Sequence, residues 1–116
     1  MKISDVKKLL NAEMICGEEL LDSEVHTACG SDMMSDVLAF VKDRALLITG
    51  LVNPQVIRTC EMMDIKCVVF VRGKQPSQMI IDLANEMGIA VMTTNERMYA
   101  ACGILYSAGL VPDGRQ

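Results

Sequence analysis

Small hydroxyls, a glycine and two cations recur in three short polar turns, each of which follows an apolar run expected to form a strand. The turns span residues 49–53, 72–75 and 93–95, and we call them together the rim. In a parallel sheet, the turns after successive strands lie along one edge, where ligands of α/β proteins commonly bind. Because backbone N–H groups and helix N-termini attract anions, this edge could hold a small anion, such as a nucleotide.

Five rim residues are predicted to border this ligand: Gly50, Asn53, Arg72, Lys74 and Thr94. Gly50 would let the ligand approach the backbone, because glycine has no Cβ. Asn53 would cap the following helix and present its N-terminus. Arg72 and Lys74 would supply positive charge, with arginine suited to forked phosphate contacts, and Thr94 would offer a hydroxyl. The alternative is that all five residues only shape turns.

Catalytic residues are harder to find in this sequence. It contains no GxSxG and no P-loop lysine motif. His26 is the only histidine, and no local signature pairs it with a nucleophile such as Cys29. We therefore predict no catalytic residues, no cofactor and no enzyme activity. The alternative is a small enzyme that acts on a phosphorylated substrate at the rim.

Two groups of acidic residues could attract a metal ion. Asp32 and Asp36 lie four residues apart on one face of an expected helix, a spacing that could bring two carboxylates near a cation. We instead expect Asp32 to cap that helix and Asp36 to be solvated. The second group consists of Glu18, Glu19, Asp22 and Glu24. We expect this group to be solvated surface, so no metal site is predicted.

Charge and composition narrow the class of protein. The net charge is −4 and the chain has no basic run, which argues against nucleic acid as a partner. No apolar stretch is long enough to span a membrane, and the first residues lack the apolar block of a signal peptide. The 5 cysteines include no CxxC pair. These features indicate a cytoplasmic protein whose cysteines are free thiols.

The hydrophobic pattern predicts a single three-layer α/β domain with a mainly parallel central sheet. Helices are expected over residues 4–10, 31–41, 54–63, 77–87 and 96–108, and strands over residues 13–16, 23–29, 45–49, 65–71 and 89–92. The last three strands should be parallel neighbours, with the first third of the chain adding strands at one edge. The domain is expected to span residues 1–110, with a flexible tail over residues 111–116.

Helix starts are predicted from residues that can accept hydrogen bonds from the first turn. Ser4 is expected to cap the first helix, Ser31 or Asp32 the second, and Asn95 the last. Asn53 followed by proline predicts the start of the third helix. In the fourth helix, the expected inner face consists of Met79, Ile80, Leu83, Ala84 and Met87.

Three segments, GSDMMSDVLAF, LLITGLVNPQVIRT and IKCVVFVRGKQP, closely resemble the small stand-alone DRTGG-domain proteins. Related domains occur in CBS-domain pyrophosphatases and in phosphotransacetylases, and the N-terminal domain of HPr kinase is a fold relative. The resemblance implies a compact, HPr kinase N-terminal-domain-like regulatory domain that self-associates and has no catalytic centre of its own. It further implies a protein partner or a small-ligand sensing role.

The chain departs from the family in its signature motif. No literal DRTGG string is present, and the corresponding region is placed at residues 49–53. Leu51 and Val52 stand where a charged pair is expected.

Adjacent methionines further predict a homodimer. Neighbouring side chains on a helix diverge by about 100°, so Met33 and Met34 cannot both face inward. The same holds for Met62 and Met63. One member of each pair is therefore expected to be available to a partner.

Overall fold

A computed structural model describes residues 1–41 and 44–112. The elements are α1 (Ile3–Leu9), β1 (Glu13–Cys16), the 3-10 helix η1 (Glu18–Leu20), β2 (Thr27–Gly30), α2 (Met34–Phe40), β3 (Ala45–Thr49), α3 (Pro54–Met62), β4 (Cys67–Phe70), α4 (Gln78–Met87), β5 (Ala90–Thr93) and α5 (Met98–Ser107). Within the described residues, no helix is both long and apolar enough to cross a membrane. Most of the predicted tail falls outside the described residues.

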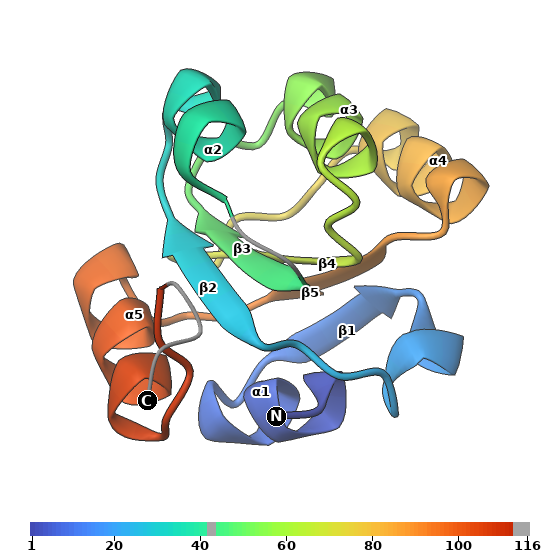
Figure 1. The fold of residues 1–116 in the computed structure, drawn as a ribbon. Coiled ribbons are helices and arrows are strands. Elements are labelled where there is room, and N and C mark those ends of the chain that lie inside the picture. The colour runs from blue at the N-terminus through green and yellow to red at the C-terminus, as the bar shows by residue number, and fades with distance from the viewer. Residues whose placement is uncertain (42–43, 113–116) are drawn as a thin grey trace.

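The elements form three layers around one sheet (Figure 1). Helices α2, α3 and α4 cover one face of the sheet, and α1 and α5 cover the other. Each face has its own buried cluster: Val56 and Ile80 pack on the first face, and Ile3 and Leu105 pack on the second. The prediction of a three-layer α/β domain is confirmed.

The strands are ordered β1-β5-β4-β3-β2 across the sheet. Strands β3, β4 and β5 are parallel neighbours, as predicted, with Leu47 opposite Val68 and Val68 opposite Val91. Every residue of these three strands is buried. Their continuous apolar character therefore reflects a parallel sheet covered on both faces.

The first third of the chain adds strands to the sheet as predicted, but at both edges rather than at one. Strand β2 joins β3 in parallel at one edge, because β2, α2 and β3 form one more strand–helix–strand unit. Strand β1 joins β5 at the other edge and runs antiparallel to it. The register of β1 shifts between Met14 and Cys16, which marks an irregularity of the kind found at sheet edges.

Helix starts followed the predictions only in part. Asn53 caps α3 by accepting a hydrogen bond from the Gln55 N–H at 2.8 Å. Ser77 caps α4, and Gly88 ends it in a left-handed conformation with φ of 71°.

Three predicted caps were wrong. The N-cap of α1 is Lys2 rather than Ser4, because the Asp5 carboxylate satisfies the Lys2 N–H instead. The N-cap of α2 is Met33, and that of α5 is Arg97 rather than Asn95. Neither of these two helices has a side-chain cap, so a capping residue nearby in the sequence did not identify the first turn.

One side chain assigned to the inner face of α4 was also misplaced. Met79 is 67% exposed, whereas Ile80 and Ala84 are buried as expected. Met79 directly precedes the buried Ile80, and because adjacent side chains on a helix diverge by about 100°, the two cannot both face the sheet.

Candidate functional site

The carboxyl ends of β3 and β4 bring three of the predicted rim residues together. Lys74 Nζ donates a hydrogen bond to the Gly50 carbonyl oxygen at 2.9 Å. The Arg72 guanidinium lies over Gly50: a Cβ on Gly50 would be only 2.5 Å from Arg72 Nη2. The space that was predicted to let a ligand approach the Gly50 backbone is therefore occupied by Arg72.

Sequence reasoning missed the most connected residue of the rim, Asp32. Its Oδ1 atom accepts hydrogen bonds from the Gly50 N–H at 2.7 Å and from the Thr49 hydroxyl at 3.2 Å. Asp32 follows β2 and was predicted to cap α2. The role of Asp32 depends on the pairing of β2 with β3. The hydrophobic pattern did not predict that pairing.

Asp32 and Arg72 lie on the same side of the Gly50 backbone. The position that a Gly50 Cβ would take is 3.4 Å from Asp32 Oδ1 and 2.5 Å from Arg72 Nη2. The second carboxylate oxygen of Asp32 has no partner in the described part of the chain, and Arg72 makes no ion pair there. An exposed hydrogen-bond acceptor and an exposed cation are thus held side by side.

Arg72 occupies an unusual backbone conformation. Its φ is 62° and that of Gly73 is 67°, and the Lys74 N–H donates to the Val71 carbonyl at 3.3 Å. This is a tight turn with two left-handed residues, of the kind that favours glycine at both positions. A non-glycine residue there costs about 1 to 2 kcal/mol. Turn geometry alone therefore does not explain why position 72 is an arginine.

The other two predicted residues, Asn53 and Thr94, form hydrogen bonds within the chain through their side-chain oxygens. Thr94 is buried, and its hydroxyl donates to the Leu10 carbonyl at 2.7 Å and accepts from the Glu96 N–H at 3.2 Å. Asn53 is exposed, but its side-chain oxygen is committed to the cap of α3. These two residues shape the turns that surround Gly50, Arg72 and Lys74.

Backbone donors at the rim are largely satisfied by the chain itself. Asp32 holds the Gly50 N–H, and the Thr49 hydroxyl holds the Leu51 N–H at 3.1 Å. An anion at this site would therefore be bound mainly by the Arg72 and Lys74 side chains, both of which are exposed. With the Asp32 carboxylate included, the three charged groups carry a net charge of +1.

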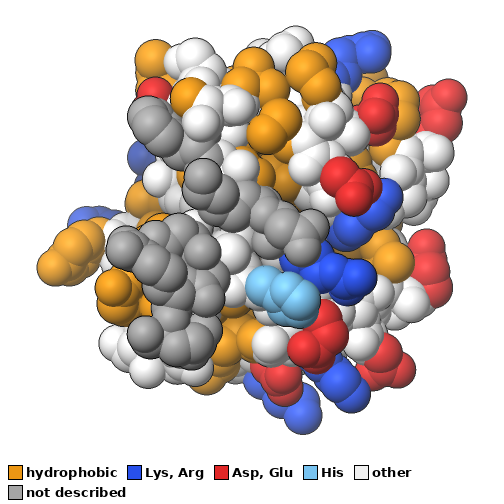
Figure 2. Space-filling model, in the orientation of Figure 1, with side chains coloured by type: hydrophobic (Ala, Val, Ile, Leu, Met, Phe, Trp, Pro, Cys, Tyr) orange, Lys and Arg blue, Asp and Glu red, His pale blue; other side chains and the backbone are white. Residues whose placement is uncertain are grey.

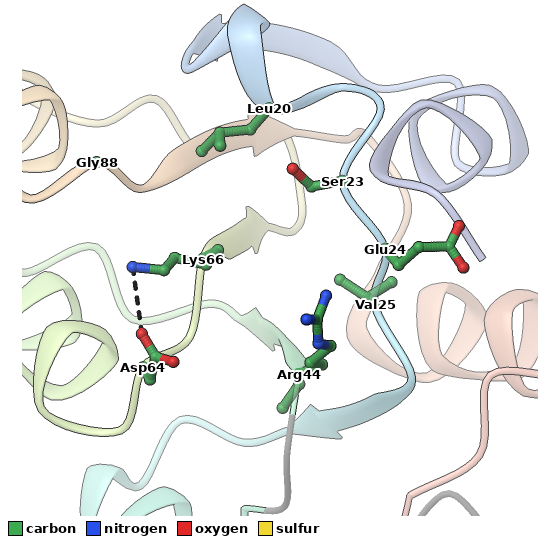
Figure 3. Close-up of a pocket in the computed structure, with 9 residues that line it drawn as sticks. Leu20, Ser23, Glu24, Val25, Arg44, Asp64, Lys66 and Gly88 are labelled. Atoms are coloured by element: carbon green, nitrogen blue, oxygen red, sulfur yellow. Dashed lines mark ion pairs between the residues drawn. The ribbon is translucent and has the colours of Figure 1, made fainter.

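A second candidate place is a cavity of about 390 Å³ at the opposite end of the parallel strands. It is lined by Leu20, Ser23, Glu24, Val25, Arg44, Ala45, Asp64, Lys66 and Gly88 (Figure 3). Lys66 extends toward Asp64, with a distance of 3.2 Å between Nζ and Oδ1. Helices α3 and α4 end near this cavity, and the partial negative charge of helix C-termini disfavours an anion there.

The cysteine thiols are poorly suited to act as nucleophiles at neutral pH, because the thiolate is the reactive form. All five cysteines are free thiols, as predicted. Burial raises the pKa of each thiol, and it raises the pKa of Cys60 to about 12. His26 is exposed. Among the described residues, no group of three His, Cys, Asp or Glu side chains could hold a metal ion.

Comparisons with known proteins are consistent with this architecture. The model of the DRTGG domain family matches residues 5–108. No curated protein matches the chain. The fold is similar to the crystal structure of the CBS and DRTGG domains of the regulatory region of Clostridium perfringens pyrophosphatase, complexed with the activator diadenosine tetraphosphate. The TM-score is 0.72 at 19% sequence identity, and the match covers 97% of this chain and 48% of that chain. The protein thus spans about half the length of its structural relative.

Proposed function

Because the chain belongs to the DRTGG domain family, we propose that it is a non-catalytic regulatory domain that senses a small anionic ligand, such as a nucleotide, at the rim. The observation that carries this proposal is the position of Arg72. Its guanidinium is exposed, makes no ion pair with the described residues, and is presented by a backbone conformation that costs free energy. Such strain is commonly retained where it positions a functional group.

The structural relative supports the class of ligand. Its regulatory region was crystallised with a dinucleoside polyphosphate activator. That region also contains CBS domains. Its ligand therefore supports the chemical class of the proposed ligand, but it does not indicate where on this chain a ligand binds. At the rim, Lys74 adds a second cation beside the forked guanidinium, which suits the charge and geometry of a phosphate group.

Titration calorimetry with AMP, ADP and ATP tests the proposal. Arg72→Ala should abolish the heat of binding, while the melting temperature stays nearly unchanged because an exposed turn arginine contributes little to folding. Arg44→Ala is a closely matched control: Arg44 is also exposed and also has a positive φ, of 52°, but it lies at the opposite end of the sheet. Arg44→Ala should bind like the wild type.

Two results would count against the rim. If Arg44→Ala abolishes binding and Arg72→Ala does not, the ligand occupies the cavity in Figure 3. If none of the three nucleotides produces heat with the wild type, the five predicted rim residues only shape turns.

We further propose that the protein forms a homodimer through the outer face of α5. The ten residues of α5, MYAACGILYS, include no charged side chain. Tyr99 and Tyr106 lie seven residues apart on one face of this helix and are 93% and 60% exposed, with the exposed Gly103 between them. A two-fold interface brings a surface against its own copy, so an uncharged face avoids self-repulsion.

Other exposed hydrophobic side chains provide a competing surface. On the face shown in Figure 2, hydrophobic side chains gather over α2 and α3, and charged side chains gather on the right. Met33 and Met62 are 61% and 66% exposed, as expected for one member of each methionine pair. Unlike α5, however, α3 carries Arg58 and Glu61, both of which are exposed.

A further inference from the structure

We propose that Asp32 makes the rim selective for a ligand that carries a sugar hydroxyl beside its phosphate, such as a ribonucleotide, over a bare phosphate. This inference rests on the proposed anion site, and it concerns which anions the site selects. A site expected to bind an anion has the Asp32 carboxylate beside its principal cation, Arg72, and this negative charge needs an explanation.

Asp32 is held rigidly at this position. One of its oxygens accepts two hydrogen bonds, from the Gly50 N–H and from the Thr49 hydroxyl. Gly50 and Thr49 are both buried, so these bonds fix the carboxylate to the end of the central sheet. The carboxylate therefore cannot turn away when an anion approaches without leaving a buried N–H unsatisfied.

The two oxygens of Asp32 have different surroundings. Oδ1 is committed to the fold, whereas Oδ2 has no partner in the described part of the chain. Because an ionised carboxylate can only accept hydrogen bonds, Oδ2 can be satisfied by a ligand only through a donor, such as a hydroxyl. Phosphate oxygens offer no such donor when ionised, and like charge repels them from Asp32.

Arg72 supplies the complementary half of the site. Its Nη2 atom and Asp32 Oδ1 both lie within 3.4 Å of the point that a Gly50 Cβ would occupy. One small ligand can therefore contact both groups, with a phosphate on Arg72 and Lys74 and a sugar hydroxyl on Asp32. Acidic side chains at the ends of parallel strands bind ribose hydroxyls in the same way in dinucleotide-binding folds.

Three probes separate the contributions of the charge and of the sugar hydroxyls: ATP, 2′,3′-dideoxy-ATP and tripolyphosphate, titrated by calorimetry without divalent metal. The wild type should bind ATP about tenfold or more tightly than the dideoxy analogue, because a hydrogen bond to a charged acceptor is lost. Asp32→Asn retains an oxygen that can accept from the Gly50 N–H but removes the negative charge. This variant should bind ATP and dideoxy-ATP almost equally and should bind tripolyphosphate more tightly than the wild type does.

Asp36→Asn is the matched control, since it removes the same charge from an exposed residue of α2. It should retain the wild-type preference for ATP. Equal binding of ATP and dideoxy-ATP by the wild type would overturn the role of Asp32 while leaving the anion site intact. A preference that survives in Asp32→Asn would also overturn it. No binding of ATP to the wild type would remove the proposed function and this inference together.

Discussion

The carboxylate of Asp32 accepts a 2.7 Å hydrogen bond from the backbone N–H of Gly50 and thereby ties the end of β2 to the end of β3. The Gly50 carbonyl is bound in turn by Lys74, from the turn after β4. Side chains from two neighbouring turns thus hold both sides of one glycine. Asp32 and Lys74 are therefore preorganised, because each is hydrogen-bonded to a buried backbone segment.

Asp32→Ala should destabilise the protein by about 1 to 3 kcal/mol, because the buried Gly50 N–H loses its acceptor. Urea unfolding at neutral pH measures this change. Asp36→Ala removes the same charge from α2 without touching Gly50 and should shift the free energy of unfolding by about 0.5 kcal/mol or less. Equal effects of the two substitutions would mean that the Asp32 contact contributes nothing beyond its charge.

Gly50→Ala should weaken nucleotide binding and leave stability within about 1 kcal/mol of the wild type. The new methyl group meets the far end of the flexible Arg72 side chain, which can move aside but then no longer lies over the turn. Calorimetry and thermal unfolding together check both halves of this expectation. Binding at wild-type affinity would show that the position of Arg72 over Gly50 is not required.

Gly17→Ala provides a contrast within the same chain. A Cβ at Gly17 would lie 2.5 Å from the Ala90 Cα, a backbone atom of a central strand, and the φ of Gly17 is 85°. Neither the contact with Ala90 nor the left-handed backbone can be relieved by moving a side chain, so the free energy of unfolding should fall by about 2 to 5 kcal/mol. Such a loss is a large part of the stability of a small domain. A mild effect at Gly17 would mean that β1 can shift away from β5.

Much of the fold could be predicted because the signals were local. The continuous apolar runs of β3, β4 and β5 and the Asn53-Pro54 helix start each depend on a few adjacent residues. The places of the edge strands could not be assigned in this way. Strand β1 pairs with β5, which is far from it in sequence, and β2 is only partly buried, so it lacks the continuous apolar run that marks the other parallel strands.

The candidate site was likewise predictable only where it depends on adjacent residues. Arg72 and Lys74 could be placed at this edge of the sheet because their turn follows a recognisable strand. Thr94 was misjudged as a ligand-facing hydroxyl, since only the folded chain places the Leu10 carbonyl 2.7 Å from it. Asp32 was missed for a related reason, namely that its partner Gly50 is 18 residues away, at the end of the neighbouring strand β3.

The free energy of unfolding should fall as the pH rises from 9 to 12. A thiol with the ordinary pKa of 9.0 loses its proton in the unfolded state, whereas burial raises the pKa of Cys60 to about 12 in the folded state. Between these values the unfolded state binds fewer protons, so the stability present below pH 9 is progressively lost. Each such thiol contributes a slope of up to about 1.4 kcal/mol per pH unit.

Cys60→Ala tests the origin of this slope. The variant should be less stable at pH 8, because it leaves a cavity in the core, but its stability should fall less steeply above pH 9. Cys102→Ala, which alters a partly buried thiol, should change the slope less. Urea unfolding at several pH values supplies the measurement, and an unaltered slope in Cys60→Ala would assign the pH dependence to other groups.

Tyr99→Asp should convert the proposed dimer into a monomer. Tyr99 is 93% exposed, so the substitution should leave the fold intact, but a two-fold interface through α5 would bring two new negative charges close together. Light scattering at micromolar concentration should give twice the chain mass for the wild type and the chain mass for the variant. Met62→Asp places the same charge on α3, at a residue that is 66% exposed, and should remain dimeric. If only Met62→Asp dissociates the dimer, the interface lies over α3; if the wild type is itself a monomer, the uncharged face of α5 has another role.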